Sequence, residues 1–236
     1  MILPRQFFHL KPCDLAISLL GKVLRHRVIL PDGQLVWLAA RIIETEAYYL
    51  EERGSHSSLG LTEARRAMFM APGTIYMYYA RGGDSLNFSA LGEGNGVLIK
   101  SGYPHFDRVS PDTTLAQMQR LNPGSQGDRP LDRLCNGQTL LCRSLGLKVT
   151  DWNQKQLQRD QFRLEDVGGH PSTIVQSVRL GIPEGRDEHL PFRFIDGDYA
   201  RHCTKNPLTM RKRPDYRELP WQQRHSATAD LPAAFQ

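Results

Sequence analysis

The run from Arg41 to Tyr48, Arg-Ile-Ile-Glu-Thr-Glu-Ala-Tyr, constrains the fold more than any other stretch, because it has the composition of a strand yet carries two carboxylates. Successive side chains of a strand point to opposite faces. Regular alternation predicts one face with Ile42, Glu44, Glu46 and Tyr48, and another with Ile43, Thr45 and Ala47. An ionised carboxylate is costly to bury unless it is paired, so the first face is either open to solvent or holds a carboxylate that does chemistry. Spacing alone leaves both alternatives open.

Short apolar runs joined by turn sequences indicate one mixed α/β domain whose strands are mostly joined by hairpins. The expected strands cover residues 22–30, 34–43 (continuing through 48), 74–80, 85–90, 96–100, 173–180 and 192–195. The expected helices cover residues 12–20, 113–121, 138–145 and 154–161, and residues 51–66 are expected to form an irregular loop. We expect one domain over residues 1–205, followed by a basic C-terminal extension over residues 206–236 that is partly disordered at its end.

Charge and composition favour an intracellular protein with an anionic partner. The net charge is +5, and seven Lys or Arg between Arg201 and Arg224 stand against Asp215 and Glu218, a balance of +5 that equals the excess of the whole chain. A basic segment of this kind indicates nucleic acid first, with a solvated tail as the alternative. No apolar run approaches the roughly 20 residues of a membrane span, and the start lacks a signal-peptide pattern. We therefore expect a cytoplasmic protein without a membrane partner.

The cysteines do not form a metal-binding pattern. No Cys-x-x-Cys pair is present, and no histidine stands near Cys135 or Cys142 to complete a zinc site. Buried free thiols are the better interpretation, and we expect neither a metal nor a cofactor.

Several polar and aromatic residues form a candidate binding set. Tyr76 and Tyr78 share a face of the expected strand 74–80, and Asn87 lies on its hairpin partner. With Tyr48 and the paired carboxylates they favour a pocket for a flat, polar, aromatic ligand, although each tyrosine taken singly is more typical of packing. His56 taken alone is more typical of a loop histidine than of a catalyst.

The basic candidates are fewer. Arg81, at the tip of the expected hairpin, has the character of an arginine that enters a narrow groove of DNA. Lys100 and Arg193 either contact phosphates or are plain surface groups. We assign both to DNA contact, together with Arg81 and Tyr76.

These residues stand in a set of motifs that resembles the alkyladenine (3-methyladenine) DNA glycosylase family. The resemblance covers roughly residues 7–200 in family order. It rests on Leu19-Leu20-Gly21-Lys22, Arg-Ile-Ile-Glu-Thr-Glu-Ala-Tyr (41–48), His56-Ser57, Met68-Phe69-Met70, Pro72-Gly73-Thr74-Ile75-Tyr76, Leu86-Asn87, Leu134-Cys135-Asn136-Gly137, Arg179-Leu180-Gly181-Ile182 and Pro191-Phe192-Arg193-Phe194. The order and spacing of the blocks make coincidence a poor explanation.

The resemblance implies a single α+β domain on a curved antiparallel sheet, with surrounding helices and a protruding hairpin that reads the minor groove of double-stranded DNA. It implies that an alkylated purine is flipped into a pocket and its N-glycosidic bond is hydrolysed; whether deaminated purines are accepted stays open. Glu46 matches the general base that activates a water. Tyr48, His56 and Tyr78 match the residues that sandwich the flipped base, and Asn87 matches the residue at the pocket edge.

The chain departs from the family pattern in places. The family usually has a tyrosine at the hairpin tip, where this chain has Arg81, and an arginine is common where Lys100 stands. We expect no amine nucleophile in the pocket, and therefore a monofunctional glycosylase without a lyase step. We also expect the protein to be monomeric and free of metal.

Two alternatives remain. One is a non-catalytic DNA-binding module on the same fold. The other is a carbohydrate hydrolase that uses Glu44 and Glu46 as an acid/base pair.

Overall fold

The computed structural model describes residues 1–80, 82–210, 216–229 and 231–235. The strands over these residues are β1 (Val23–Ile29), β2 (Leu35–Tyr48), β3 (Ile75–Ala80), β4 (Gly83–Ser89), β5 (Gly96–Pro104), β6 (Phe162–Glu165), β7 (Thr173–Ser177), β8 (Arg193–Asp196) and β9 (Tyr216–Pro220). The α-helices are α1 (Pro12–Leu19), α2 (Leu115–Leu121), α3 (Gln138–Leu145), α4 (Val149–Trp152) and α5 (Ser226–Ala229).

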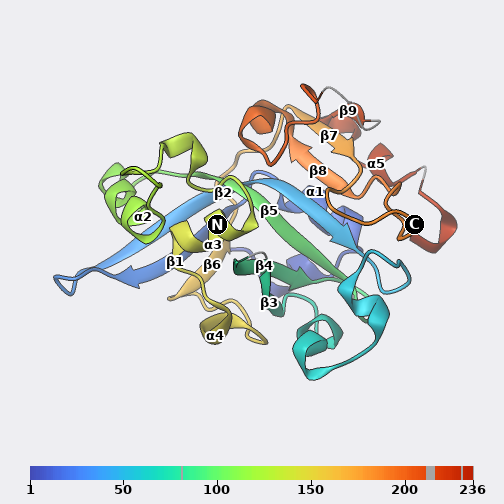
Figure 1. Ribbon diagram of the computed structural model, residues 1–236, viewed down its shortest axis with the longest axis horizontal. Coiled ribbons are helices and arrows are strands. Elements are labelled where there is room, and N and C mark those ends of the chain that lie inside the picture. Colours follow the sequence, from blue (N-terminus) through green and yellow to red (C-terminus); the bar gives the residue numbers. More distant parts are fainter. Residues whose placement is uncertain (81, 211–215, 230, 236) are drawn as a thin grey trace.

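The long strand β2 lies at the centre of an antiparallel sheet (Figure 1). One edge of β2 pairs with β5, which continues to β4 and β3. Its other edge pairs with β1 over its first half and with β8 over residues 44–46, and β8 continues to β7 and β9. Every pairing between these strands is antiparallel, which confirms the expected α+β class with its helices around an antiparallel sheet.

The main core lies where α1 and α3 pack against the central strands. Pro12 begins α1, since the first turn needs no backbone donor there. Gly146 ends α3 in the left-handed conformation, at φ 68°. Leu15 of α1 and Leu141 of α3 are both fully buried in this core. These two helices and their ends are as the sequence predicted.

The β2–β5 ladder is irregular next to the two glutamates. The paired residues are Ile42–Gly102, then Glu44–Ser101, then Thr45–Ile99. Ile43 and Lys100 therefore have no opposite residue in the ladder. An extra unpaired residue of this kind re-aims the side chains around it.

The irregularity corrects the predicted assignment of faces in β2. Ile42 lies in the main core, whereas Ile43 packs on the other face in a second cluster that includes Val175 and Ile195. Beyond the irregularity, the Thr45 hydroxyl donates to the carbonyl of Ala16 in α1, and Ala47 is in the main core. Ile42 thus does not share a face with the glutamates, because regular alternation is broken between Ile42 and Thr45.

The prediction was wrong around residues 154–165. Residues 154–161 do not form a helix: Gln154 has φ 63°, and Gln156 and Gln158 make isolated bridges to Thr74 and Phe162. A left-handed residue stops a helix from starting there. The strand β6, which pairs with β1, follows directly and was missed in the sequence.

The C-terminal extension is part of the fold over its described residues. β9 covers the edge of β7, and Ala227 and Leu231 are buried in the main core. Phe235 packs on Tyr49 and Phe192. Over residues 216–229 and 231–235 the end of the chain packs on the fold, because it carries apolar side chains that the core buries. Arg211, Lys212 and Arg213 lie outside the described residues.

The four cysteines are free and buried, as predicted. In the described part of the chain, no helix is both long and apolar enough to cross a membrane.

Candidate active site

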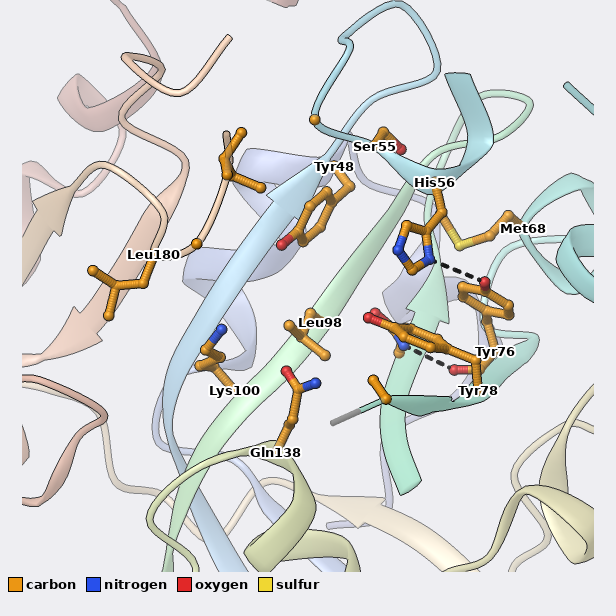
Figure 2. A pocket seen from close by; sticks show the side chains of 15 residues that line it. Tyr48, Ser55, His56, Met68, Tyr76, Tyr78, Leu98, Lys100, Gln138 and Leu180 are labelled. Atoms are coloured by element: carbon orange, nitrogen blue, oxygen red, sulfur yellow. Dashed lines mark hydrogen bonds between the residues drawn. The ribbon is translucent and has the colours of Figure 1, made fainter. Parts of the chain in front are cut away.

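A cavity of about 190 Å³ opens between the end of β2, the β3–β4 hairpin and the loop at residues 54–56 (Figure 2). An engineered protein cavity of about 150 Å³ binds benzene, so this volume suits a flat ring. The lining residues are Tyr48, Gly54, Ser55, His56, Met68, Tyr76, Tyr78, Ala80, Asn87, Leu98, Lys100, Gln138, Leu180, Gly181 and Ile182.

Aromatic rings form one wall of the cavity. Tyr76 and Tyr78 point to the same side of β3 and stack with ring centroids 5.3 Å apart. The His56 ring lies 4.7 Å from that of Tyr78, and its Nδ1 is 3.4 Å from the Tyr76 hydroxyl. Tyr48 stands across the cavity from His56 and Tyr78 (Figure 2). A flat ring would fit between them by stacking.

Asn87 and His56 are the polar groups of this wall. The Asn87 amide donates to the Tyr76 carbonyl at 3.0 Å, which fixes its orientation. Burial, together with the charges of Arg65 and Arg186, holds the pKa of His56 below its usual 6.5. The imidazole is therefore neutral at pH 7 and can donate one hydrogen bond and accept another. The structure brings together Tyr48, His56, Tyr78 and Asn87, and adds Tyr76, which was expected to contact DNA instead.

Glu46 is fully buried and is bound by two residues that line the cavity. The Tyr48 hydroxyl donates to its Oε2 at 2.7 Å, and the Lys100 ammonium is 3.2 Å from its Oε1. Burial alone would raise the pKa of this carboxyl, but Lys100, the Tyr48 hydroxyl and two buried arginines outweigh burial and lower the pKa below 4.5. Glu46 is therefore ionised at neutral pH. Its Oε1 accepts no hydrogen bond from the described residues.

Glu44 accepts hydrogen bonds on both of its oxygens. Its Oε1 accepts from Arg193 at 2.7 Å, and its Oε2 accepts from Ser101 and from the backbone amide of Thr204. Strand spacing could not choose between Glu44 and Glu46. The contacts distinguish them, because both oxygens of Glu44 accept hydrogen bonds from residues outside the cavity, whereas the partners of Glu46, Tyr48 and Lys100, line the cavity.

Arg193 is not at the surface. Its guanidinium is fully buried, in an ion pair with Glu44 and in hydrogen bonds to the carbonyls of Thr204 and Lys205. This placement differs from the expected contact with DNA, since a buried, paired guanidinium has no face to offer a phosphate. The apolar neighbours of Arg193 in the sequence did indicate a buried strand.

Lys100 also differs from expectation. It was assigned to DNA phosphates, but its side chain is 11% exposed, lines the cavity and pairs with Glu46. The statement that no amine stands in the pocket is thereby corrected. The local run around residue 100 is apolar and gave no sign of an ion pair with a residue 54 positions earlier.

Arg179 holds the pocket residue Tyr48 and the loop after β2 in place, a role that the sequence did not predict. Its guanidinium forms a fully buried, two-pronged ion pair with Glu52 and donates to the Ala47 carbonyl at 3.0 Å. It also lies 4.6 Å from the centre of the Tyr48 ring. Arg179 thus fixes the loop after β2 and one face of the pocket tyrosine.

Arg81 lies outside the described residues, so its expected entry into DNA is a proposal. The neighbouring Gly82 has φ 82°, as the tight turn requires, and Tyr79 is 72% exposed.

An antiparallel sheet that carries an aromatic pocket, with a buried, ionised carboxylate bound to two of the pocket residues, is suited to a protein that encloses a flat ring beside a negative charge. A family model, methylpurine-DNA glycosylase, matches residues 6–200. The chain belongs to this family.

Relatives named 3-methyladenine DNA glycosylase occur in Pseudomonas. The one from Pseudomonas aeruginosa strain LESB58 is 60% identical over 207 residues, covering 87% of this chain and 84% of that protein. The one from Pseudomonas syringae pv. tomato is 60% identical over 203 residues, covering 86% and 89%. A mouse protein named DNA-3-methyladenine glycosylase is 34% identical over 199 residues, covering 80% of this chain and 57% of the mouse protein.

Proposed function

We propose that this protein is a DNA repair glycosylase that flips alkylated purines out of double-stranded DNA and hydrolyses the N-glycosidic bond with a water activated by Glu46. The observation that carries the proposal is an ionised, buried Glu46 held by two residues of the aromatic cavity, Tyr48 and Lys100, with an Oε1 that accepts no hydrogen bond from the described residues. The names of the bacterial and mouse relatives support the same activity.

The cavity suits a flipped purine. Enzymes that act on a base take it out of the stack and hold it between aromatic side chains, which offsets the cost of unstacking. Tyr48 would cover one face of the base, and His56 with Tyr78 the other (Figure 2). Asn87, fixed by its bond to Tyr76, would lie against one edge and test its exocyclic groups.

The bond-breaking step uses the carboxylate. Cleavage passes through an oxocarbenium-like state at C1′, which a nearby negative charge stabilises. Oε1 of Glu46 would accept a proton from the attacking water, while the Tyr48 hydroxyl holds Oε2. Because burial and the Glu46 charge keep the pKa of Tyr48 well above its usual value, that hydroxyl stays a donor. Cationic alkylated purines leave readily, so they need less acid assistance than hypoxanthine, which we propose as a second, slower substrate.

The alternatives are less well supported. A carbohydrate hydrolase needs two available carboxylates, and both oxygens of Glu44 are bound by Arg193, Ser101 and Thr204. A non-catalytic DNA-binding module gives no reason for a buried, ionised carboxylate that is held by two cavity residues and accepts no hydrogen bond on Oε1. One chain supplies every described pocket residue, which favours a protein that acts as a monomer. The bacterial relatives favour action on DNA in the cytoplasm.

The test is release of free base from methylated DNA and from a hypoxanthine-containing duplex, with no added metal. We expect 3-methyladenine or 7-methylguanine to be released, and hypoxanthine more slowly. Salt-dependent binding to the same DNA without release of either base would support the binding module instead.

A further inference from the structure

We propose that an exposed apolar tip, Leu59-Gly60-Leu61, packs as a wedge against the stacked base pair beside the flipped nucleotide. These three residues are called the leucine tip below. The inference rests on the proposed function, because it takes the flipped base to lie in the aromatic cavity. It adds to that function a set of residues that holds the duplex outside the cavity.

The leucine tip presents two large apolar side chains to solvent. Leu59 is 66% exposed and Leu61 is 62% exposed. Between them Gly60 has φ 82°, and a Cβ added there would meet nothing within 4 Å. A single exposed leucine is ordinary in a protein. Two leucines that flank an unobstructed glycine turn form a larger apolar surface, which is stabilised when a partner removes it from water.

The position of the tip relative to the cavity indicates which partner covers it. Residues His56–Leu59 form a 3₁₀ turn, and His56 lines the cavity. In such a turn, side chains three residues apart lie on the same side, and the rise is about 2 Å per residue. Leu59 therefore lies on the side of His56, about 6 Å further along the turn. Bases of one DNA strand are about 3.4 Å apart, so Leu59 reaches the pairs next to a nucleotide held against His56.

Arg65 holds the tip and the cavity residue together and keeps a positive charge beside them. Its guanidinium donates to the carbonyl oxygens of His56 and Leu59, at 3.4 Å each. Among the described residues no carboxylate pairs with Arg65, and its Nε has no hydrogen-bond partner there. The neighbouring Arg66, by contrast, lies 3.5 Å from Glu63. A cation without a counter-charge attracts DNA phosphates.

The minor groove of a duplex fits this combination of groups. Proteins that bind there insert apolar side chains, leucine among them, between base steps, and use Arg or Lys beside them. A flipped base leaves its neighbouring pair with an uncovered face, and an apolar side chain packed on that face removes it from water. The leucine tip would thus stabilise the flipped state from the duplex, while Tyr48 and Tyr78 hold the base itself.

The test compares the Leu59→Ser/Leu61→Ser protein with wild type on a duplex in which hypoxanthine is paired with thymine. Single-turnover release of hypoxanthine should become about 10-fold slower or more, the effect expected from losing a buried leucine contact. Release from the corresponding single strand should stay at the wild-type rate, because no stacked pair has to be opened there. Both replaced side chains are exposed, so Tm should not change.

Two controls separate the wedge from a general effect of changing the surface. Leu59→Met/Leu61→Met keeps apolar side chains and should release hypoxanthine at close to the wild-type rate. Ile29 and Leu35 form another exposed apolar pair, 68% and 55% exposed, opposite each other in the β1–β2 ladder. Ile29→Ser/Leu35→Ser should leave release unchanged.

A stacking reporter provides a measurement that does not depend on the release rate. The base analogue 2-aminopurine fluoresces more strongly when it is unstacked. It is placed in turn on each side of the hypoxanthine and followed by stopped flow before the base is released. Wild type should raise the fluorescence on at least one side, and Leu59→Ser/Leu61→Ser should lose that rise. Equal fluorescence and equal release rates for the two proteins would overturn the wedge and favour a protein partner for the exposed leucines.

The wedge and the proposed function can fail separately. Release by wild type, with equal rates in Leu59→Ser/Leu61→Ser on the paired duplex, would overturn the wedge and leave the glycosylase function standing. Absence of release by wild type from methylated and from hypoxanthine-containing DNA would overturn the glycosylase function. A fluorescence rise that wild type produces and Leu59→Ser/Leu61→Ser loses would still support the wedge in that case.

Discussion

Two glutamates two positions apart in β2 show how strongly neighbours decide what a side chain can do. Glu44 is bound by a buried arginine, a hydroxyl and a backbone amide, and serves as a structural anchor between β2, β5 and β8. Glu46 is held by one hydroxyl and one ammonium, both from residues that line the cavity, and its Oε1 accepts no hydrogen bond from the described residues, so we propose that Oε1 binds the substrate water. The residue type is the same, and the difference lies in what the neighbouring strands bring to it.

The Glu46–Lys100 pair predicts a pH effect. Burial raises the pKa of Glu46, and the Lys100 charge is the strongest influence that opposes it. In Lys100→Gln burial remains and the charge is lost, so the pKa rises. Glu46 must be ionised to act as a base. On acidification, Lys100→Gln should therefore lose activity at a higher pH than wild type does.

The measurement is the acidic limb of kcat/KM for release of 7-methylguanine, which reports the free enzyme. The limb should lie below pH 4.5 in wild type, the usual value from which the pKa is lowered. It should move upward in Lys100→Gln and stay near its wild-type position in Lys100→Arg, which keeps the charge. An unmoved limb in Lys100→Gln would show that Lys100 does not tune this carboxyl.

At the scale of elements, contacts within a hairpin could be predicted from the sequence, whereas contacts between elements distant in the sequence could not. Tyr76, Tyr78 and Asn87 were placed together correctly, because a hairpin pairs residues that are close in the sequence. Lys100, Arg179 and Arg193 were not, because each finds its partner on another element. The Arg193–Glu44 and Arg179–Glu52 pairs span 149 and 127 positions. No local periodicity carries that information. The strand β9 was not predicted for the same reason: its sequence is polar, and it forms a strand by pairing with β7, which lies far away in the sequence.

The C-terminal segment gives a prediction about stability. Leu231 is buried in the main core, so Leu231→Ala should lower the free energy of unfolding by about 2–5 kcal/mol. For a chain of this size, each kcal/mol corresponds to about 2–4 °C in Tm. Thermal unfolding measures it, with the exposed neighbour changed in Ala233→Ser as the control. An unchanged Tm in Leu231→Ala would mean that the end of the chain does not dock in solution.

The β3–β4 hairpin gives a prediction about base flipping. We propose that Arg81 fills the gap left by the flipped nucleotide, so Arg81→Ala should slow single-turnover release of hypoxanthine from a paired duplex. Release from single-stranded DNA should change much less, because there the base is already unstacked. Equal rates for wild type and variant on the paired duplex would remove Arg81 from this role.

At the scale of the whole molecule, the β1–β2 hairpin extends at one end and the C-terminal segment packs at the other (Figure 1). The family match ends at residue 200, so the basic segment after Arg201 is an addition to it. Within that segment Arg217 is already bound to Gln176 and to backbone carbonyls of residues 226 and 227. Arg217 therefore serves the fold, and we propose that other cations of the segment attract DNA.

Salt dependence tests the second role. Each lysine or arginine that neutralises a phosphate contributes a slope of about −0.9 to log K against log salt. Replacing Arg211, Lys212 and Arg213 with glutamine should flatten this slope on a lesion-free duplex. The same change at Arg5, Arg108 and Arg159, three exposed arginines elsewhere, is the charge-matched control. A slope unaltered by the first triple change would assign the segment no part in DNA contact.

The most direct measurement compares single-turnover base release by Glu46→Gln and Glu44→Gln on methylated DNA. Loss of a general base typically lowers a rate by about 10²–10⁴-fold, so Glu46→Gln should bind lesion DNA and release base that much more slowly. Glu44→Gln should lower Tm, because it leaves the buried Arg193 without its counter-charge. Its folded fraction should still release base at close to the wild-type rate. Near-wild-type release by a folded Glu46→Gln protein would contradict the central claim that this carboxylate activates the water.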